Sequence, residues 1–191
     1  MAFGHQSRVG KNTAAEAVRV GLGAQGVSVK VVSFAALLKW QAHELWGHHG
    51  LEDGSFYEDL KGPGPGLRDT LLPEINKTPV QLWIEYGQAV RTVYGPSWAD
   101  ACLAQRRPDR LLVISDLRFD NEGDLIHEYG GWCVKIEREG CPVKGSDEMI
   151  RKNFVWDATI ENNGDITALQ AAAWGVARAY LSRKFDWQPG S

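Results

Sequence analysis

The chain has 191 residues, of which 43% are hydrophobic and 24% charged, and its formal net charge is -3 at pH 7. These values are ordinary for a globular protein of one domain that buries a full hydrophobic core. The slightly acidic balance argues against broad electrostatic binding to nucleic acid, which needs a basic face. Phosphorylated small molecules stay allowed as partners, because a local cluster of Arg and Lys is enough to bind them.

The cysteines and the hydropathy pattern indicate the cellular compartment. The three cysteines, Cys102, Cys133 and Cys141, are an odd number without a C-x-x-C pair, so the spacing predicts neither a disulfide framework nor a zinc site. No apolar run approaches the roughly 20 residues of a membrane-spanning helix, and the N-terminus lacks the core of a signal peptide. We therefore expect no membrane partner and a location in the reducing cytoplasm.

The most informative motif opens the chain and reads Gly4-His-Gln-Ser-Arg-Val-Gly10-Lys11-Asn12-Thr13. A glycine-containing turn that leads into a helix presents backbone N–H groups and the positive end of the helix dipole to an anion. Lys11 stands where the lysine of a phosphate loop bridges the outer phosphates of a nucleotide. The alternative is a helix N-terminus capped by Gly10 or Asn12, with Lys11 merely solvated.

The motif departs from the usual pattern G-x-x-x-x-G-K-[ST]. Gly4 comes one position too early, and the hydroxyl after the lysine is that of Thr13 instead of residue 12. Only residues 1–3 precede the loop, whereas a strand that feeds such a loop runs for about five residues. Either this strand is very short or it begins upstream.

Helical and strand patterns alternate along the rest of the chain. The spacing of apolar residues predicts helices over 11–24, 35–46, 79–93, 96–105, 119–129 and 165–184. It predicts strands over 27–34, 110–115, 131–137 and 157–161. This alternation predicts a single α/β domain over 1–191, built in three layers from a mostly parallel sheet with helices on both faces. Ligands then belong at the carboxyl ends of the strands.

Two stretches read as loops near the site. Residues 47–66 are rich in glycine and end in Lys61-Gly-Pro-Gly-Pro-Gly66, which is typical of a mobile loop on the substrate side. Residues 138–148 form a short basic loop that could act as a lid. The adjacent His48 and His49 invite a metal interpretation, but no further His or Cys lies at ligand spacing.

A second informative block follows the predicted strand over 110–115. Asp116 comes directly after this strand, and Arg118 follows two residues later. Proteins with a phosphate loop hold Mg²⁺ at an acidic residue in this position, often through water. Arg118 could point into the same crevice. The alternative is a turn in which Asp116 only caps the following helix.

Several stretches, in this order, resemble the bacteriophage-type deoxynucleoside monophosphate kinases, a branch of the phosphate-loop nucleotide kinases. The matching stretches are Gly10-Lys11-Asn12-Thr13; Ser33-Phe34-Ala35 with Leu38-Lys39; Lys77-Thr78-Pro79 with Tyr86-Gly87 and Arg91; Ser115-Asp116-Leu117-Arg118-Phe119 with Asn121-Glu122; and Ile160-Glu161-Asn162-Asn163-Gly164. The resemblance implies transfer of the γ-phosphoryl group of ATP to a deoxynucleoside 5′-monophosphate, with Mg²⁺. The acceptor oxygen is already anionic, so this reaction needs cations more than a general base.

The resemblance also implies roles for individual residues. Residues expected to bind the phosphates of ATP are Arg8, Val9, Gly10, Lys11, Asn12 and Thr13, with Thr13 and Asp116 at the metal. Catalytic residues are expected to be Lys11, Arg8, Asp116, Arg118 and Arg138, the last from the lid-like loop. Residues expected to bind the acceptor are Lys39, Trp83, Tyr86, Arg91 and Arg118. Trp83 and Tyr86 would stack on the base, although their helical spacing favours core packing.

Two other functions fit the same residues. One is a different phosphate-loop kinase with a hydroxyl acceptor, such as a dephospho-CoA or nucleoside kinase, which needs a carboxylate base from Asp116 or from 52–59. The other is a nucleotide-binding module without transferase activity, which the irregular first loop would suit. In each case the partners are small nucleotides, and the apolar and tryptophan content is compatible with a homodimer. A phage protein would work in the host cytoplasm.

Overall fold

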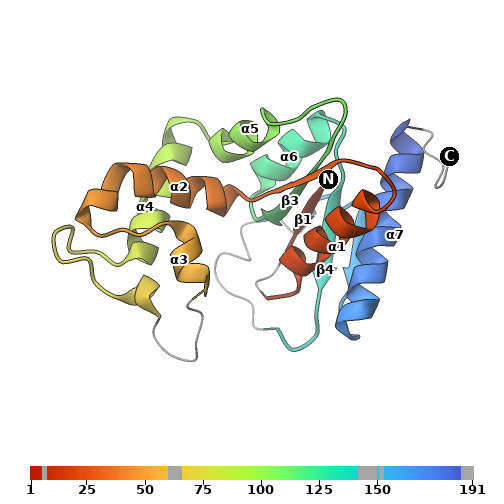
Figure 1. Cartoon of the computed structure of the whole chain (residues 1–191). Coiled ribbons are helices and arrows are strands. Elements are labelled where there is room, and N and C mark those ends of the chain that lie inside the picture. The colour runs from red at the N-terminus through yellow and green to blue at the C-terminus, as the bar shows by residue number, and fades with distance from the viewer. Residues whose placement is uncertain (6–7, 60–65, 142–149, 151–152, 186–191) are drawn as a thin grey trace. The chain divides into compact units, whose positions relative to one another are not determined.

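The computed structural model describes residues 1–5, 8–59, 66–141, 150 and 153–185 (Figure 1). The chain divides into two compact units. The first unit combines Met1–Ser33 with Ala99–Ser191, and the second unit is Phe34–Trp98. Within the described ranges, no helix is long and apolar enough to cross a membrane.

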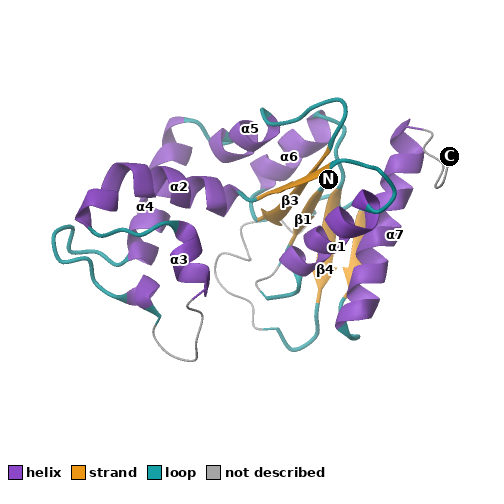
Figure 2. Ribbon diagram, viewed as in Figure 1, coloured by secondary structure: helices purple, strands orange, loops and turns teal. Residues whose placement is uncertain are grey.

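The first unit is built on a five-stranded sheet (Figure 2). Its strands are β1 (Ala2–Gly4), β2 (Val29–Val32), β3 (Leu111–Leu117), β4 (Cys133–Glu137) and β5 (Ala158–Glu161), in the order β2-β3-β1-β4-β5. Every strand pair is parallel, which confirms the α/β class and sharpens the expected "mostly parallel" to wholly parallel. The short β1 lies at the centre of the sheet.

Helices cover both faces of this sheet. The helices of this unit are α1 (Lys11–Gly23), α6 (Asp120–Glu128) and α7 (Ile166–Phe185), and α5 (Ser97–Leu103) crosses the boundary between the units. Val134 on β4 packs into the core formed with α1 and α7. The preceding residue, Cys133, points to the other face, where its Sγ lies 3.8 Å from the carbonyl oxygen of Gly123 on α6. Successive residues of a strand alternate between faces, so the sheet is the middle of three layers.

The pattern of apolar residues explains the main elements. Ala14, Val18 and Leu22 recur every four residues and are fully buried, so one face of α1 packs on the sheet. The run from Leu111 to Ser115 is buried throughout, which suits a strand covered by helices on both faces.

The described part of the second unit is mainly helical, with one isolated antiparallel bridge between Leu72 and Lys77. Its helices are α2 (Phe34–Trp46), η1 (Gly47–His49), α3 (Gly54–Asp59), η2 (Leu67–Asp69) and α4 (Pro79–Val93). Thr78 starts α4 with a capping box: its hydroxyl accepts a hydrogen bond from the Gln81 N–H, and the Gln81 side chain accepts one from the Thr78 N–H. At Gly87 an added Cβ would lie 2.5 Å from Leu38, so glycine lets α2 and α4 approach closely.

The structure corrects three expectations from the sequence. β2 covers only 29–32 of the predicted 27–34. The stretch 47–66, expected to be a loop, contains η1 and α3, and its residues 60–65 lie outside the described part. β3 continues past residue 115 because Leu117 pairs with Gly4, which places Asp116 inside the strand. Of the lid-like loop, only 138–141 are described.

Candidate functional site

The first loop ends in a left-handed glycine at the start of α1. The loop follows β1 and ends at Gly10, which caps α1 in the left-handed region with a φ of 98°. Gly10 has no side chain with which to cap this helix end, and the first turn holds no acidic residue. The first N–H groups of a helix have no partner within the helix, so this end offers donors and a positive dipole to an anion.

The loop is held against the rest of the first unit. Val9 is fully buried, and its carbonyl oxygen accepts a hydrogen bond of 2.9 Å from the Asn162 Nδ2. A Cβ added at Gly10 would lie 2.7 Å from the Leu169 side chain and 2.9 Å from that Nδ2. Residue 10 must therefore be glycine for two reasons, its positive φ and this close approach. These contacts fix the end of the loop at Val9 and Gly10.

Lys11 is the first residue of α1 and is only 8% exposed. Its Nζ donates a hydrogen bond of 3.0 Å to the carbonyl oxygen of His5, across the loop. A buried ammonium group costs free energy unless it is hydrogen-bonded or paired, and the His5 carbonyl oxygen supplies one partner. Asn12 is exposed and Thr13 half-buried in the same first turn.

Asp116 lies on β3, between the strands that carry Ser33 and the loop. The Ser33 Oγ, just after β2, donates a hydrogen bond of 2.8 Å to the Asp116 Oδ2. On the other side of β3, Gly4 at the end of β1 pairs with Leu117. The strands are parallel, so their carboxyl ends share one edge of the sheet, and this edge carries both the loop and Asp116.

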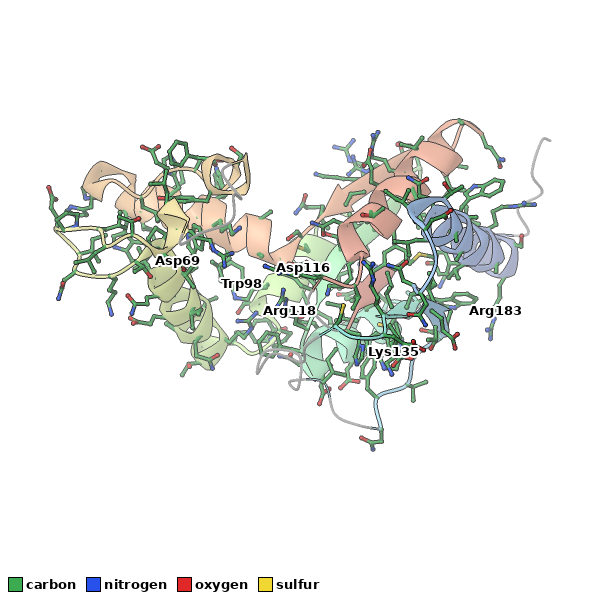
Figure 3. All side chains as sticks on the ribbon, turned by 90° about the horizontal axis from the view of Figure 1, so that it is seen from below. Asp69, Trp98, Asp116, Arg118, Lys135 and Arg183 are labelled. Carbon is green, nitrogen blue, oxygen red and sulfur yellow. The ribbon has the colours of Figure 1, made fainter. Side chains whose placement is uncertain are left out.

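Glu122 fixes the turn that carries Arg118. Glu122 is 2% exposed, and its Oε2 accepts hydrogen bonds from the backbone N–H groups of Arg118 and Phe119 at 3.0 and 3.1 Å. This carboxylate satisfies donors at the start of α6 that have no helical partner. Arg118 is half-buried, close to Asp116 at the end of β3 (Figure 3).

The donors at this edge suit a hard cation. Thr13 and Ser33 supply hydroxyl oxygens and Asp116 a carboxylate, the ligand types that Mg²⁺ takes. The residues present therefore fit Mg²⁺. Burial, and next the charges of Asp116 and Glu122, raise the pKa of the Cys102 thiol to about 12.

His5 is the first residue of the loop after β1. Its pKa is lowered, mainly by burial and next by the charge of Lys135. The His5 Nδ1 is buried without a hydrogen-bond partner in the described structure, and the ring meets Trp156 edge-on with centroids 6.3 Å apart. His5 also has a φ of 88°, which is unusual for a residue other than glycine.

The two other arginines of the first unit with a role predicted from the sequence lie at the surface. Arg8 is exposed in the loop with a φ of 64°, and Arg138 is exposed just after β4. The Asn163 Oδ1 accepts a hydrogen bond of 2.9 Å from the Glu139 N–H, which ties the start of the basic loop to the residues after β5. Residues 142–148 of that loop lie outside the described part.

In the second unit, Lys39 and Trp83 come together. The Lys39 Nζ on α2 lies 4.8 Å from the centroid of the Trp83 ring on α4, a cation–π contact. Trp83 is 8% exposed, and its ring meets Tyr57 edge-on with centroids 5.2 Å apart. This burial favours core packing for Trp83 over stacking on a base.

Tyr86 and Arg91 lie further along α4. The Tyr86 hydroxyl donates a hydrogen bond of 3.1 Å to the Gln41 Oε1, and the ring, half-buried, has edge-on contacts with Trp46 and Trp98. Arg91, also half-buried, follows one turn after Gly87, where its Nη1 lies 3.5 Å from the position of an added Cβ. The half-buried Tyr86 hydroxyl and Gln41 form a polar pair beside an aromatic cluster.

Four residues of this description had no role in the sequence reasoning. Ser33, Gln41, Glu122 and Asn162 were unassigned, although three of them fall in the stretches that resemble the kinases. The role of Glu122 could have been predicted, because a Glu in the first turn of a helix often accepts hydrogen bonds from backbone N–H groups. Gln41 and Asn162 had none, because their partners are 45 and 153 residues away.

The histidine pair makes a different contact. The rings of His48 and His49 lie 3.9 Å apart, and the His49 Nδ1 lies 2.6 Å from the Glu74 Oε2. One carboxylate beside this pair makes an ion pair when His49 is protonated.

Comparison with known proteins gives one partial similarity. No protein-family model matches the chain. Over 67 residues the chain is 37% identical to a protein of Acanthamoeba polyphaga mimivirus named "Putative deoxynucleotide monophosphate kinase". The match covers 34% of this chain and 35% of that protein, so the chain spans about a third of its length. The fold is consistent with a phosphate-loop kinase, and the similarity supports a relationship to nucleotide kinases.

Proposed function

We propose that this chain is a deoxynucleoside monophosphate kinase that transfers the γ-phosphoryl group of ATP to a deoxynucleoside 5′-monophosphate, giving ADP and the diphosphate. The observation that carries this proposal is the loop before α1. Lys11 is buried and held across the loop, the left-handed Gly10 opens an uncapped helix end, and Asp116 lies at the same sheet edge. The partial similarity to a protein named as such a kinase adds the acceptor class.

The donor would bind to the first unit. The N–H groups at the start of α1 would hold the phosphates, while Lys11 would leave the His5 carbonyl oxygen for the β- and γ-phosphates. Mg²⁺ supplies charge neutralisation between those phosphates when it is bound. Asp116 and Thr13 would hold it, and the Ser33 hydroxyl fixes one carboxylate oxygen of Asp116.

The transfer would depend on positioned cations. The attacking atom is a phosphate oxygen of the acceptor, which is already anionic, so no side chain has to remove a proton. Arg118 would neutralise charge on the transferring group, because Glu122 fixes its backbone beside Asp116. Arg8 and Arg138 are exposed and would add charge only once substrate is bound.

The second unit holds the other residues that the sequence assigns to the acceptor. We assign the acceptor phosphate to Lys39 and Arg91. We assign the base to Tyr86, with Gln41 as its hydrogen-bonding neighbour. The Gln41 amide can both donate to and accept from a base edge, so this pair is a candidate for base selection. The cation–π contact with Trp83 would hold the Lys39 side chain in position.

The test is a coupled assay of ADP release with ATP, Mg²⁺ and each of the four deoxynucleoside monophosphates, with the matching ribonucleotides alongside. We expect turnover with one or more deoxynucleotides. Silence with all of them while ATP still binds would contradict the kinase and favour a nucleotide-binding module. Turnover only with a hydroxyl acceptor, such as a nucleoside, would replace the proposed acceptor class.

A further inference from the structure

A second group of potential ligands lies in the first unit, away from the loop. It combines His127 on α6, Cys133 at the start of β4 and Asp157 just before β5. One donor atom from each residue lies within 4.8 Å of the other two. None of these residues takes part in the proposed phosphoryl transfer.

Contacts within the group hold the side chains in place. The Asp157 Oδ2 accepts a hydrogen bond of 2.8 Å from the Cys133 N–H and lies 2.9 Å from the His127 Nε2. The His127 ring stacks on Phe154, with the ring planes 13° apart. The Asp157 N–H also donates to the Cys133 carbonyl oxygen at 2.9 Å, so backbone pairing fixes two of the three residues.

The three side chains differ in their exposure to solvent. Cys133 is fully buried, whereas the side chains of His127 and Asp157 are 28% and 25% exposed. A cation could enter past the histidine and the carboxylate and meet the thiol inside. Burial, and next the charge of Asp157, raise the pKa of this thiol to about 12; the positive N-terminus of Met1 opposes this shift and the charge of Asp124 adds to it. The same negative charges would attract a divalent cation.

We propose that His127, Cys133 and Asp157 form a binding site for a Zn²⁺ ion. An imidazole nitrogen, a thiolate and a carboxylate are all zinc ligands, and a water molecule would complete a tetrahedral site. With ordinary zinc–ligand distances the donor atoms would lie about 3.4–3.6 Å apart. Side-chain rotations that move these atoms by about 1 Å would bring them to this separation. Binding releases the Cys133 thiol proton to solvent. The His127 Nε2 gives up its hydrogen bond to Asp157, and its proton leaves to solvent while the ring keeps a hydrogen on Nδ1, so that the Nε2 lone pair takes the metal.

The sequence could not show this site by spacing. Its ligands come from three separate elements, and the ordinary C-x-x-C signal is absent. A bound ion would link α6 to the starts of β4 and β5, and we expect it to stabilise the first unit. The sheet edge that carries Lys11 and Asp116 would not be involved.

Co²⁺ titration of the chelator-treated full chain, without nucleotide, tests the site directly. We expect one equivalent to give intense visible bands of a tetrahedral ion and a thiolate-to-metal absorption in the near ultraviolet, both abolished when Zn²⁺ displaces Co²⁺. Cobalt bound at Asp116 would have oxygen ligands only and would give no thiolate band. The expected result is therefore distinct from metal at the nucleotide site.

Matched variants assign the ligands. Cys133→Ser should lose the thiolate absorption, while Cys102→Ser, which alters another fully buried cysteine of the same unit, and Cys141→Ser should keep it. His127→Gln, at a half-exposed position, should weaken Zn²⁺ binding at least about tenfold in competition with a chromophoric chelator, whether or not Cys133→Ser folds. No thiolate band in the unmodified chain, or a band that survives in Cys133→Ser, would overturn the proposal.

Discussion

The two units of the chain hold their candidate residues by different means. In the first unit, backbone conformation and hydrogen bonds to backbone groups position the candidate residues. Gly10 is left-handed, Lys11 donates to a loop carbonyl oxygen and Glu122 accepts from two backbone N–H groups. In the second unit, side-chain packing dominates, because Lys39 lies on Trp83 and Tyr86 lies between aromatic rings. Substitutions should therefore affect chemistry mainly in the first unit and stability mainly in the second.

The largest effect on chemistry should come from Arg118. Arg118→Ala should lower kcat by about 10³-fold or more, because an arginine that neutralises a transferring phosphoryl group contributes about 10³–10⁵-fold. The ADP-release assay measures kcat, and ATP binding, measured separately, should be unchanged. Arg19→Ala, which alters an exposed arginine paired with Glu16, is the control and should be silent. Near-normal turnover of Arg118→Ala would remove it from the site.

The largest effect on stability should come from Trp83. Trp83→Ala should lower the free energy of unfolding by about 3–5 kcal/mol, as for other buried aromatic residues. Trp83→Phe should keep most of the packing and leave the KM for the acceptor within about threefold, less than 1 kcal/mol. Urea unfolding and acceptor titrations measure the two quantities. A large rise in KM for Trp83→Phe at unchanged stability would show that Trp83 stacks on the base.

A smaller effect should follow at the loop glycine. Gly10→Ala should cost about 1–3 kcal/mol of stability, from the positive φ and the contacts with Leu169 and Asn162, and should weaken ATP binding. Gly23→Ala is the matched control at the other end of α1. An added Cβ at Gly23 meets nothing within 4 Å, so this change should stabilise the chain by about 0.4–1 kcal/mol. Equal ATP affinity in both variants would mean that the loop does not bind phosphate.

The smallest effect concerns pH. The folded chain lowers the pKa of His5 below its ordinary value of 6.5, so the unfolded chain binds a proton more readily. The His5 contribution to stability is then present above about pH 6.5 and is lost as the pH falls below it. His5→Asn should flatten this dependence, as seen in urea midpoints at about pH 7.5 and about pH 5.5. A variant that keeps the full slope would assign the pH dependence to other groups.

The same contrast explains how far the sequence could be read. The alternation of elements, the bounds of α4 and the loop before α1 follow from local signals: apolar spacing, the Thr78-Pro79 start and the glycine–lysine pair. The Ser33–Asp116 and Asn162–Val9 contacts depend on strand order, which no local pattern encodes. Helix α3 was missed because its glycine-rich surroundings resemble a loop, and its burial of Tyr57 is decided by tertiary packing.

The most direct test of the proposed kinase is transfer of label from γ-labelled ATP to a deoxynucleoside monophosphate, by the unmodified chain and by Lys11→Met. The unmodified chain should form labelled diphosphate. Lys11→Met should lose at least about 10²-fold in rate, because it removes a preorganised charge at the phosphates. Lys184→Met, which alters an exposed lysine bonded to the Gly130 carbonyl oxygen, should keep the activity. Absence of labelled diphosphate, or equal rates for the unmodified chain and Lys11→Met, would contradict the assignment of the loop as the catalytic phosphate site.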